Sequence, residues 1–272
     1  MAKKGGVEMR DIYRFADGNL RCHHNWDEPS GENRPMHTHN HIELYYFISG
    51  NCRCLVEGTE YWLKPRDILA IRPMEAHTMR WYEGAPYERI GIQLPVERLA
   101  QVDPEGELLD FMMARPLGTD NRFTDADFGH HLCSDAFQTI GEGLTAAGLL
   151  ARSALILSEI KRTVECRGIA PRSNELGARI IDYVNRELFS PISLEQVSTE
   201  FYISRSQLNR IFKQNTGASF WQYVIAKRLQ AAHRRIQAGE PAMLVAEECG
   251  YQEYSTFYRA YVKRFGESPK SK

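Results

Sequence analysis

Histidine and acidic side chains gather in one short stretch of the N-terminal half of the chain. His37, His39, His41 and Glu43 occupy alternate positions, and His77 follows further along. Residues two apart share one face of an extended strand, so the first four side chains can all point the same way. Imidazole and carboxylate groups that converge are suitable ligands for Zn, Ni, Mn or Fe ions. The spacing therefore predicts a polar cluster able to bind a divalent metal ion.

Three uses of this cluster are open from the residues alone. It could hold a metal ion, it could hydrogen-bond the hydroxyl groups of an organic effector, or its members could simply satisfy one another. The aromatic residues Tyr45, Trp62, Trp81 and Tyr82 could stack on a sugar ring in the second case. At alternating strand positions such rings are more often part of the core.

A second chemical signal lies in the C-terminal part of the chain. Ser193 is a good N-cap for a short helix, and Ser204 is a good N-cap for a second helix over Arg205–Gln214. Leu208 and Phe212 fall on one face of that second helix, opposite basic and amide side chains. Two short helices joined by a tight turn form a helix-turn-helix.

The same pattern returns about 50 residues later in the chain. Residues 243–249 predict a short helix, Gly250-Tyr251 a turn, and residues 255–264 a second helix with Arg259 facing outward. Residues 220–238 are long enough to form one helix that links the two units. The sequence thus predicts a pair of helix-turn-helix units.

Exposed side chains on the second helix of each unit have the chemistry that reads DNA. An α-helix fits the major groove, where arginine pairs with guanine and asparagine pairs with adenine. Arg210 and Arg259 are the predicted guanine contacts, and Asn209 is the predicted adenine contact. The secondary base readers are Ser206, Gln207, Ser255 and Tyr258. The predicted phosphate contacts are Arg205, Lys213, Lys263 and Arg264.

Regularly spaced short strands must position the histidine cluster. Turn residues divide the segment between Asn33 and Leu94 into strands over residues 42–49, 52–56, 59–63, 68–71, 79–82 and 87–94. Such a series predicts a small barrel or a double-sheet jelly roll. After Pro95 the apolar period lengthens, which predicts helices over residues 97–101, 105–113, 125–140 and 144–164.

Composition agrees with a two-domain globular protein. The chain has 272 residues, of which 43% are hydrophobic and 25% are charged, and six cysteines are too few for a disulfide scaffold. No apolar run is long enough to cross a membrane, so we expect a cytoplasmic protein without a membrane partner. Residues 171–272 hold 15 Lys and Arg against 10 Asp and Glu, whereas residues 1–170 hold 19 against 25. This asymmetry favours nucleic-acid binding by the C-terminal part.

The C-terminal residues resemble the DNA-binding domain of AraC-type (arabinose-regulator-like) transcription factors. The resemblance covers about residues 175–270 and ends in Gly266-Glu267-Ser268-Pro269. The matching residues are 205–213, 216–220, Tyr223, Arg228-Leu229, Ala232, Val245-Ala246, Gly250-Tyr251, 255–257 and Arg259. Ser198 departs from the usual alanine and Val262 from the usual lysine, so the resemblance implies one fewer phosphate contact from the second unit.

The N-terminal half resembles a cupin. The spacing Gly31-x5-His37-x-His39-x3-Glu43-x6-Gly50 matches the first motif of that family, whereas the second motif is partial because Asp67 replaces a glycine. The resemblance implies the metal ligands His37, His39, Glu43 and His77. The effector pocket that it implies has these four residues together with Tyr45 and Trp62. AraC-type regulators commonly keep a cupin-like domain as a small-molecule pocket rather than as an enzyme site.

The two resemblances imply a two-domain α+β protein. We expect a cupin-like effector-binding and dimerisation domain over residues 1–167, a linker over 168–174, and an all-α DNA-binding domain over 175–272. The helix-turn-helix units should cover about residues 191–214 and 241–264. The helix over 144–164 is the candidate dimer interface, and packing against its own barrel is the alternative.

The expected function is sequence-specific binding of double-stranded DNA under the control of a small molecule. The implied protein is a transcription activator that responds to a carbohydrate, forms a homodimer, contacts RNA polymerase and catalyses no reaction. The competing function is that of a metal-dependent cupin enzyme with an accessory helical domain. An architectural DNA-binding protein is a third possibility, but it leaves the histidine cluster without a use.

Overall fold

The computed structural model describes residues 9–28, 35–82, 86–171 and 174–270. Its strands are β1 (Met9–Asp17), β2 (Leu20–Asp27), β3 (His41–Ser49), β4 (Cys52–Val56), β5 (Thr59–Trp62), β6 (Ile68–Ile71), β7 (His77–Trp81), β8 (Tyr87–Pro95) and β9 (Arg122–Phe123). Its first helices are α1 (Val96–Leu99), α2 (Glu107–Ala114), α3 (Asp125–Phe128), α4 (Leu132–Gln138) and α5 (Ala146–Arg167). The remaining helices are α6 (Leu176–Arg186), α7 (Leu194–Glu200), α8 (Arg205–Thr216), α9 (Phe220–Gln237), α10 (Ala242–Glu248) and α11 (Tyr254–Phe265).

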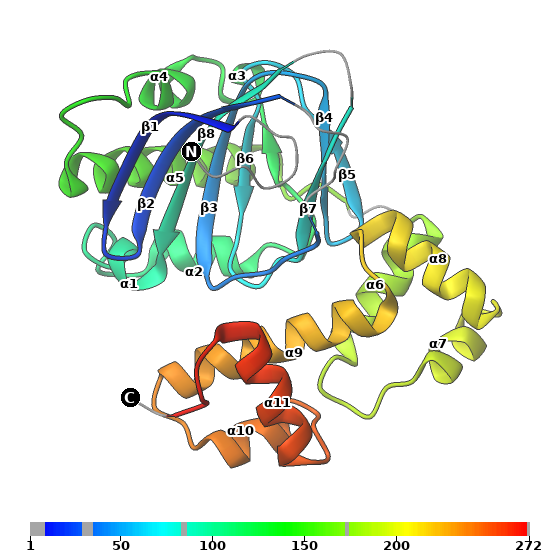
Figure 1. Cartoon of the computed structure of the whole chain (residues 1–272). Helices are drawn as coiled ribbons and strands as arrows, with labels where there is room; N and C mark the ends of the chain where they lie inside the picture. The colour runs from blue at the N-terminus through cyan, green and yellow to red at the C-terminus, as the bar shows by residue number, and fades with distance from the viewer. Residues whose placement is uncertain (1–8, 29–34, 83–85, 172–173, 271–272) are drawn as a thin grey trace.

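Two antiparallel sheets form the N-terminal half, which we call the sensor half (Figure 1). One sheet has six strands in the order β1-β2-β8-β3-β6-β9, and the other has three in the order β5-β4-β7. Alternate residues of both sheets point inward, so that Tyr45, Phe47, Cys54, Met79 and Tyr87 form one buried cluster. The double-sheet barrel predicted from the spacing of turn residues is confirmed.

Strands β1 and β2 were not predicted. They pair with each other, and β2 pairs with β8, which extends the large sheet toward the N-terminus. Strand β1 lies at the sheet edge, where most of its side chains are exposed. An edge strand has little apolar alternation, and that weakened the sequence signal.

The predicted helix over 125–140 is wrong in part, because Gly129 adopts a φ of 76° and separates α3 from α4.

Helix α5 packs on the large sheet of its own sensor half. Leu149, Ile156, Leu157 and Ile160 are fully buried and join a cluster with residues of β2, β3, β6 and β8. Leu155 is partly buried against the same cluster. The apolar stripe that made this helix the candidate dimer interface is therefore occupied within the chain, and the alternative interpretation is correct. A charge at Ile156 would disrupt the sensor core instead of producing a folded monomer.

The C-terminal half contains two helix-turn-helix units joined by α9, as the sequence predicts (Figure 1). Ser204 accepts a hydrogen bond from the Gln207 backbone N–H and begins α8, and Ser219 caps α9 in the same way through Gln222. Gly217, at a φ of 78°, ends α8. The first unit packs around Leu208, Phe212 and Tyr223, and the second around Phe257 and Tyr261. We call this half the DNA-binding half, after the function that its resemblance implies.

The segment between the halves lies between the end of α5 at Arg167 and the start of α6 at Leu176. Residues 172–173 of the predicted linker lie outside the described residues, and the predicted domain boundaries stay a prediction. Among the described residues, no helix is both long and apolar enough to cross a membrane.

Candidate functional site

The predicted histidine and glutamate cluster is assembled near the N-terminal ends of β3 and β7. His37 and His39 precede β3, Glu43 lies on β3, and His77 begins β7. One ligand atom from each of these four residues lies within 4.8 Å of the others. Glu43 Oε2 is 3.2 Å from His39 Nε2 and 3.1 Å from His77 Nε2. A backbone bridge between His37 and His77 joins the two strand ends that carry the ligands. Gly31, the first residue of the cupin-like motif, lies outside the described residues.

The second nitrogen of each imidazole is held by the backbone. His37 Nδ1 lies 3.1 Å from the Pro35 carbonyl, His39 Nδ1 3.1 Å from the His41 carbonyl, and His77 Nδ1 3.0 Å from the Glu75 carbonyl. A carbonyl oxygen only accepts, so each Nδ1 must carry the proton. A ring that is neutral then offers the lone pair of its Nε2. Metal-binding histidines are oriented in this way by hydrogen bonds outside the coordination sphere.

The pKa shifts within the cluster favour an anionic Glu43 carboxylate beside the imidazole rings. Burial and, to a smaller extent, the neighbouring His77 lower the pKa of His37 to about 3, so this ring is neutral at pH 7. Burial raises the pKa of Glu43, but the imidazoles of His39 and His77 outweigh burial and hold that pKa well below its usual range. Burial lowers the pKa of His77, and the Glu43 carboxylate more than offsets this effect. The cluster therefore holds a proton or a metal cation between its acceptor atoms.

The two predicted aromatic pocket residues do not lie together. Tyr45 is buried in the barrel, where its hydroxyl accepts a hydrogen bond of 2.9 Å from Arg89 Nε. Trp62 is 51% exposed on the outer face of the small sheet, where it stacks on Tyr82. The assignment of Trp62 to the histidine pocket is wrong, because its neighbour Tyr61 takes the inward position in the strand.

Trp62 instead borders an open cleft of about 490 Å³ outside the barrel. This cleft lies between strand β5, the loop before β9 and the end of α5. Its lining residues are Thr59, Glu60, Tyr61, Trp62, Gly118, Thr119, Asp120, Arg122, Asp127, Arg167, Ala170 and Pro171. A ligand in this cleft would touch the start of the segment that joins the two halves.

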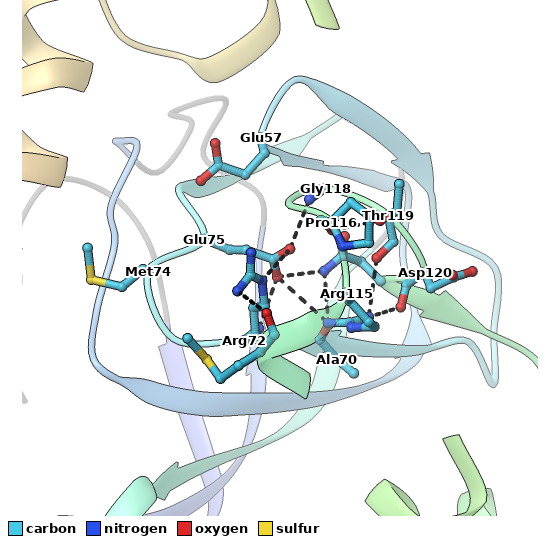
Figure 2. A network of polar contacts seen from close by, with 12 residues as sticks. Glu57, Ala70, Arg72, Met74, Glu75, Arg115, Pro116, Gly118, Thr119 and Asp120 are labelled. Atoms are coloured by element: carbon cyan, nitrogen blue, oxygen red, sulfur yellow. Dashed lines mark hydrogen bonds and ion pairs between the residues drawn. The ribbon is translucent and has the colours of Figure 1, made fainter. Parts of the chain in front are cut away.

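Glu75 is at the centre of a network of polar contacts that sequence reasoning missed (Figure 2). Its side chain is fully buried and accepts hydrogen bonds from the backbone N–H groups of Arg72 and Gly118, each 2.9 Å long. Arg115, which is also buried, lies 3.9 Å from Glu75 and donates hydrogen bonds to the carbonyls of Ala70, Thr119 and Asp120. This network orients the loop whose carbonyl at Glu75 holds His77. A lone glutamate and a lone arginine 40 residues apart carry no sequence signal for such a pair.

Most of the predicted DNA contacts are exposed on α8 and α11. The exposed residues are Arg205, Ser206, Arg210, Lys213, Ser255, Tyr258, Arg259, Lys263 and Arg264, and Gln207 is half-buried. Arg210 and Arg259 stand at equivalent places in their helices. Arg205 is ion-paired with Glu195 of α7. The Arg264 guanidinium donates a 3.2 Å hydrogen bond to the Thr38 carbonyl of the sensor half.

Asn209, the predicted adenine contact, also makes a hydrogen bond within the DNA-binding half. Its side chain is half-buried, and its Oδ1 accepts a 3.3 Å hydrogen bond from the backbone N–H of Phe220. That N–H belongs to the first turn of α9, where helices leave backbone donors without partners. Asn209 thus joins α8 to the linking helix through one of the two lone pairs of its Oδ1.

Comparison with known proteins agrees with this arrangement. The AraC-like ligand binding domain family matches residues 22–109, and a helix-turn-helix domain family matches residues 197–271. MarA, the multiple antibiotic resistance protein of Salmonella typhimurium, is 33% identical over 91 residues, which are 33% of this chain and 72% of MarA. The probable transcriptional regulator LumQ of Photobacterium leiognathi is 30% identical over 130 residues, which are 44% of this chain and 52% of LumQ. The crystal structure of ToxT from Vibrio cholerae O395 aligns with 93% of this chain and 96% of its own, at 10% identity and a TM-score of 0.39.

These features define a DNA-binding transcription regulator with a ligand-binding domain at its N-terminal side. The chain belongs to the AraC family.

Proposed function

We propose that this chain recognises a specific DNA sequence through α8 and α11 and that the sensor half controls this recognition. The observation that carries the proposal is the pair of exposed arginines, Arg210 and Arg259, at equivalent places on two helices that α9 joins. Their guanidinium groups can pair with guanine, while Lys213 and Lys263 neutralise phosphates. The names of relatives such as LumQ support a regulatory rather than an enzymatic use of the fold.

Selection of binding sites from random duplex DNA tests this proposal. We expect a motif with two half-sites about one helical turn, roughly 34 Å, apart. Arg210→Ala should then lose about 1–3 kcal/mol of binding free energy at one base pair of the motif and keep its nonspecific affinity. Lys263→Ala should instead weaken binding to all sequences and reduce the salt dependence.

Arg234→Ala is the matched control for Arg210→Ala, since Arg234 is exposed on α9 and outside the recognition helices. Fluorescence anisotropy on matched and single-mismatch duplexes measures both effects. An equal loss of affinity on every duplex for Arg210→Ala would contradict its role as a base reader.

We further propose that His37, His39, Glu43 and His77 bind one divalent transition-metal ion. The support is chemical, because the three Nδ1 atoms are held by carbonyls and the four remaining ligand atoms lie within 4.8 Å. Such an ion would hold together the ends of β3 and β7 with no need for a reaction. The ligand set contains nitrogen and oxygen, which suits Zn, Ni, Mn or Fe.

The metal proposal predicts one ion per chain after purification and dialysis, measured by mass spectrometry. Added metal at about 100 times its dissociation constant should stabilise the protein by about 2.7 kcal/mol, visible as a higher melting temperature. Glu43→Gln should lose both effects, whereas Glu60→Gln, on the exposed strand β5, should keep them. Protein that takes up none of the four metals and melts at an unchanged temperature would refute the site.

The finer parts of the proposal are a carbohydrate effector, activation through RNA polymerase, a homodimer and a cytoplasmic location. The support for a carbohydrate is that the cleft beside Trp62 combines an aromatic ring with the charged groups of Arg122 and Asp127. An effector acts only through different affinities for two arrangements of the protein. Binding of the selected DNA with and without monosaccharides checks this part.

A further inference from the structure

A buried ion pair joins the sensor half to the DNA-binding half. Glu57 lies at the tip of the hairpin between β4 and β5, and Lys227 lies on α9. Their side chains are 0% and 3% exposed, and Lys227 Nζ is 2.5 Å from Glu57 Oε1. The other carboxylate oxygen accepts hydrogen bonds from the Tyr223 hydroxyl and, at 2.9 Å, from Asn185 Nδ2. Three polar groups of one half therefore converge on a single carboxylate of the other.

The turn that carries Glu57 is an unusual place for a glutamate. Glu57 and Gly58 have φ values of 47° and 85°, which is the conformation of a two-residue turn that favours asparagine, aspartate or glycine. Its partners Lys227, Tyr223 and Asn185 explain why a glutamate occupies this position, because only a long carboxylate side chain reaches all three from the tip of the turn. A Cβ atom on Gly58 would lie 2.4 Å from Ile181 Cδ1, so the tip is seated directly against α6.

Glu57 and Lys227 also bind the loop that leads into His77 of the histidine cluster. The Ala76 backbone N–H donates to Glu57 Oε1 over 2.6 Å, and Lys227 Nζ donates to the Met74 carbonyl over 2.8 Å. Ala76 directly precedes His77 and is buried in the apolar core of the first helix-turn-helix unit. Met74 packs against the core of the second unit. The loop that positions His77 thus contacts both units.

Each recognition helix is also held separately by the sensor half. Arg80 donates hydrogen bonds of 2.9 and 3.0 Å to the carbonyls of Lys213 and Gln214 at the end of α8. Arg264 of α11 donates to the carbonyl of Thr38, the residue between His37 and His39. This second bond occupies a side chain predicted to contact phosphate. The two recognition helices cannot adjust independently to DNA while both contacts persist.

We infer that the Glu57–Lys227 contact is a latch. It restrains DNA binding while the two halves are packed together, and it opens when the metal ion proposed for the histidine cluster binds or is lost. This inference rests on the proposed function, since it names how the sensor half controls the DNA-binding half. Opening hydrates Glu57 and Lys227, frees Arg264 and lets the two recognition helices adapt to their grooves. Ligands act on such a latch by binding one arrangement more tightly than the other.

Glu57→Asn tests the latch. Asparagine suits the left-handed turn, so this change removes the carboxylate without harming the hairpin. We expect the affinity for the selected DNA to rise about tenfold or more, because a larger fraction of molecules is competent to bind. The radius of gyration from small-angle X-ray scattering should rise in the same variant. Glu105→Asn is the matched control, since Glu105 is an exposed glutamate of the same half, away from this contact, and should change neither quantity.

A second variant approaches the latch from the other half. Lys227→Met should raise DNA affinity in the same direction, and the double variant should show no further rise, because both changes open one contact. Unchanged affinity and radius in Glu57→Asn would overturn the latch, and so would a lower affinity, which would mean that docking assists DNA binding. If the wild type selects no DNA at all, the proposed function fails. An unchanged affinity of Glu57→Asn for DNA that the wild type does select refutes only the latch.

Discussion

Replacing Glu75 with leucine is expected to destabilise the sensor half by about 4 kcal/mol, because removal of one partner strands a buried opposite charge. Arg115 has a side chain that is 0% exposed and would lose its carboxylate partner. The backbone N–H groups of Arg72 and Gly118 would lose their acceptor at the same time. Urea unfolding monitored by circular dichroism measures the loss of stability as a lower urea concentration at the unfolding midpoint.

Glu105→Leu is the control for this prediction, since Glu105 is exposed on the surface of the same half. A midpoint for Glu75→Leu equal to that of the control would show that the buried network does not stabilise the fold. The variant should also bind metal more weakly, because the loop that carries the carbonyl partner of His77 loses its support.

Arg228→Leu is expected to destabilise the DNA-binding half by a similar amount, about 4 kcal/mol, since charged hydrogen bonds to three backbone carbonyls are lost together. The Arg228 guanidinium donates to the carbonyls of Leu188, Ser190 and Gly250 over 2.7, 2.8 and 2.8 Å. The first two carbonyls precede α7, and the third lies in the turn between α10 and α11. One side chain on the linking helix therefore ties both helix-turn-helix units to a common frame.

Urea unfolding and DNA anisotropy together test the role of Arg228. Arg234→Leu, which changes an exposed arginine of the same helix, is the control. Arg228→Lys should give an intermediate loss, because lysine keeps the charge but cannot reach three carbonyls in one plane. If Arg228→Leu unfolds at the same midpoint as Arg234→Leu and binds the two half-sites equally well, the two units do not depend on this arginine.

The sequence predicted the features that depend on neighbouring residues. Ser193 and Ser204 cap helices in the structure as expected, because a cap needs only a donor three residues away. The close spacing of His37, His39 and Glu43 placed these residues in one cluster, although His37 and His39 precede strand β3. Local spacing is sufficient in such cases, so the barrel and both helix-turn-helix units could be predicted.

Other features depended on how distant segments pack. Helix α5 had an apolar stripe that suited either a dimer or its own barrel, and only packing decided between them. Trp62 and Tyr61 alternate across one strand, and the sequence does not say which ring faces inward. Asn209 also accepts a hydrogen bond from the backbone of α9, and this contact was not predicted from the sequence.

The sequence by itself determined the two kinds of chemistry in this protein, a histidine and glutamate cluster and a pair of basic recognition helices. Tertiary structure alone decided that the two are connected. Glu57 and Lys227 are 170 residues apart and become partners only when the hairpin tip enters the DNA-binding half. The physical reason is that caps and alternation act over a few residues, whereas a buried ion pair forms only where two folded surfaces exclude water from both charges.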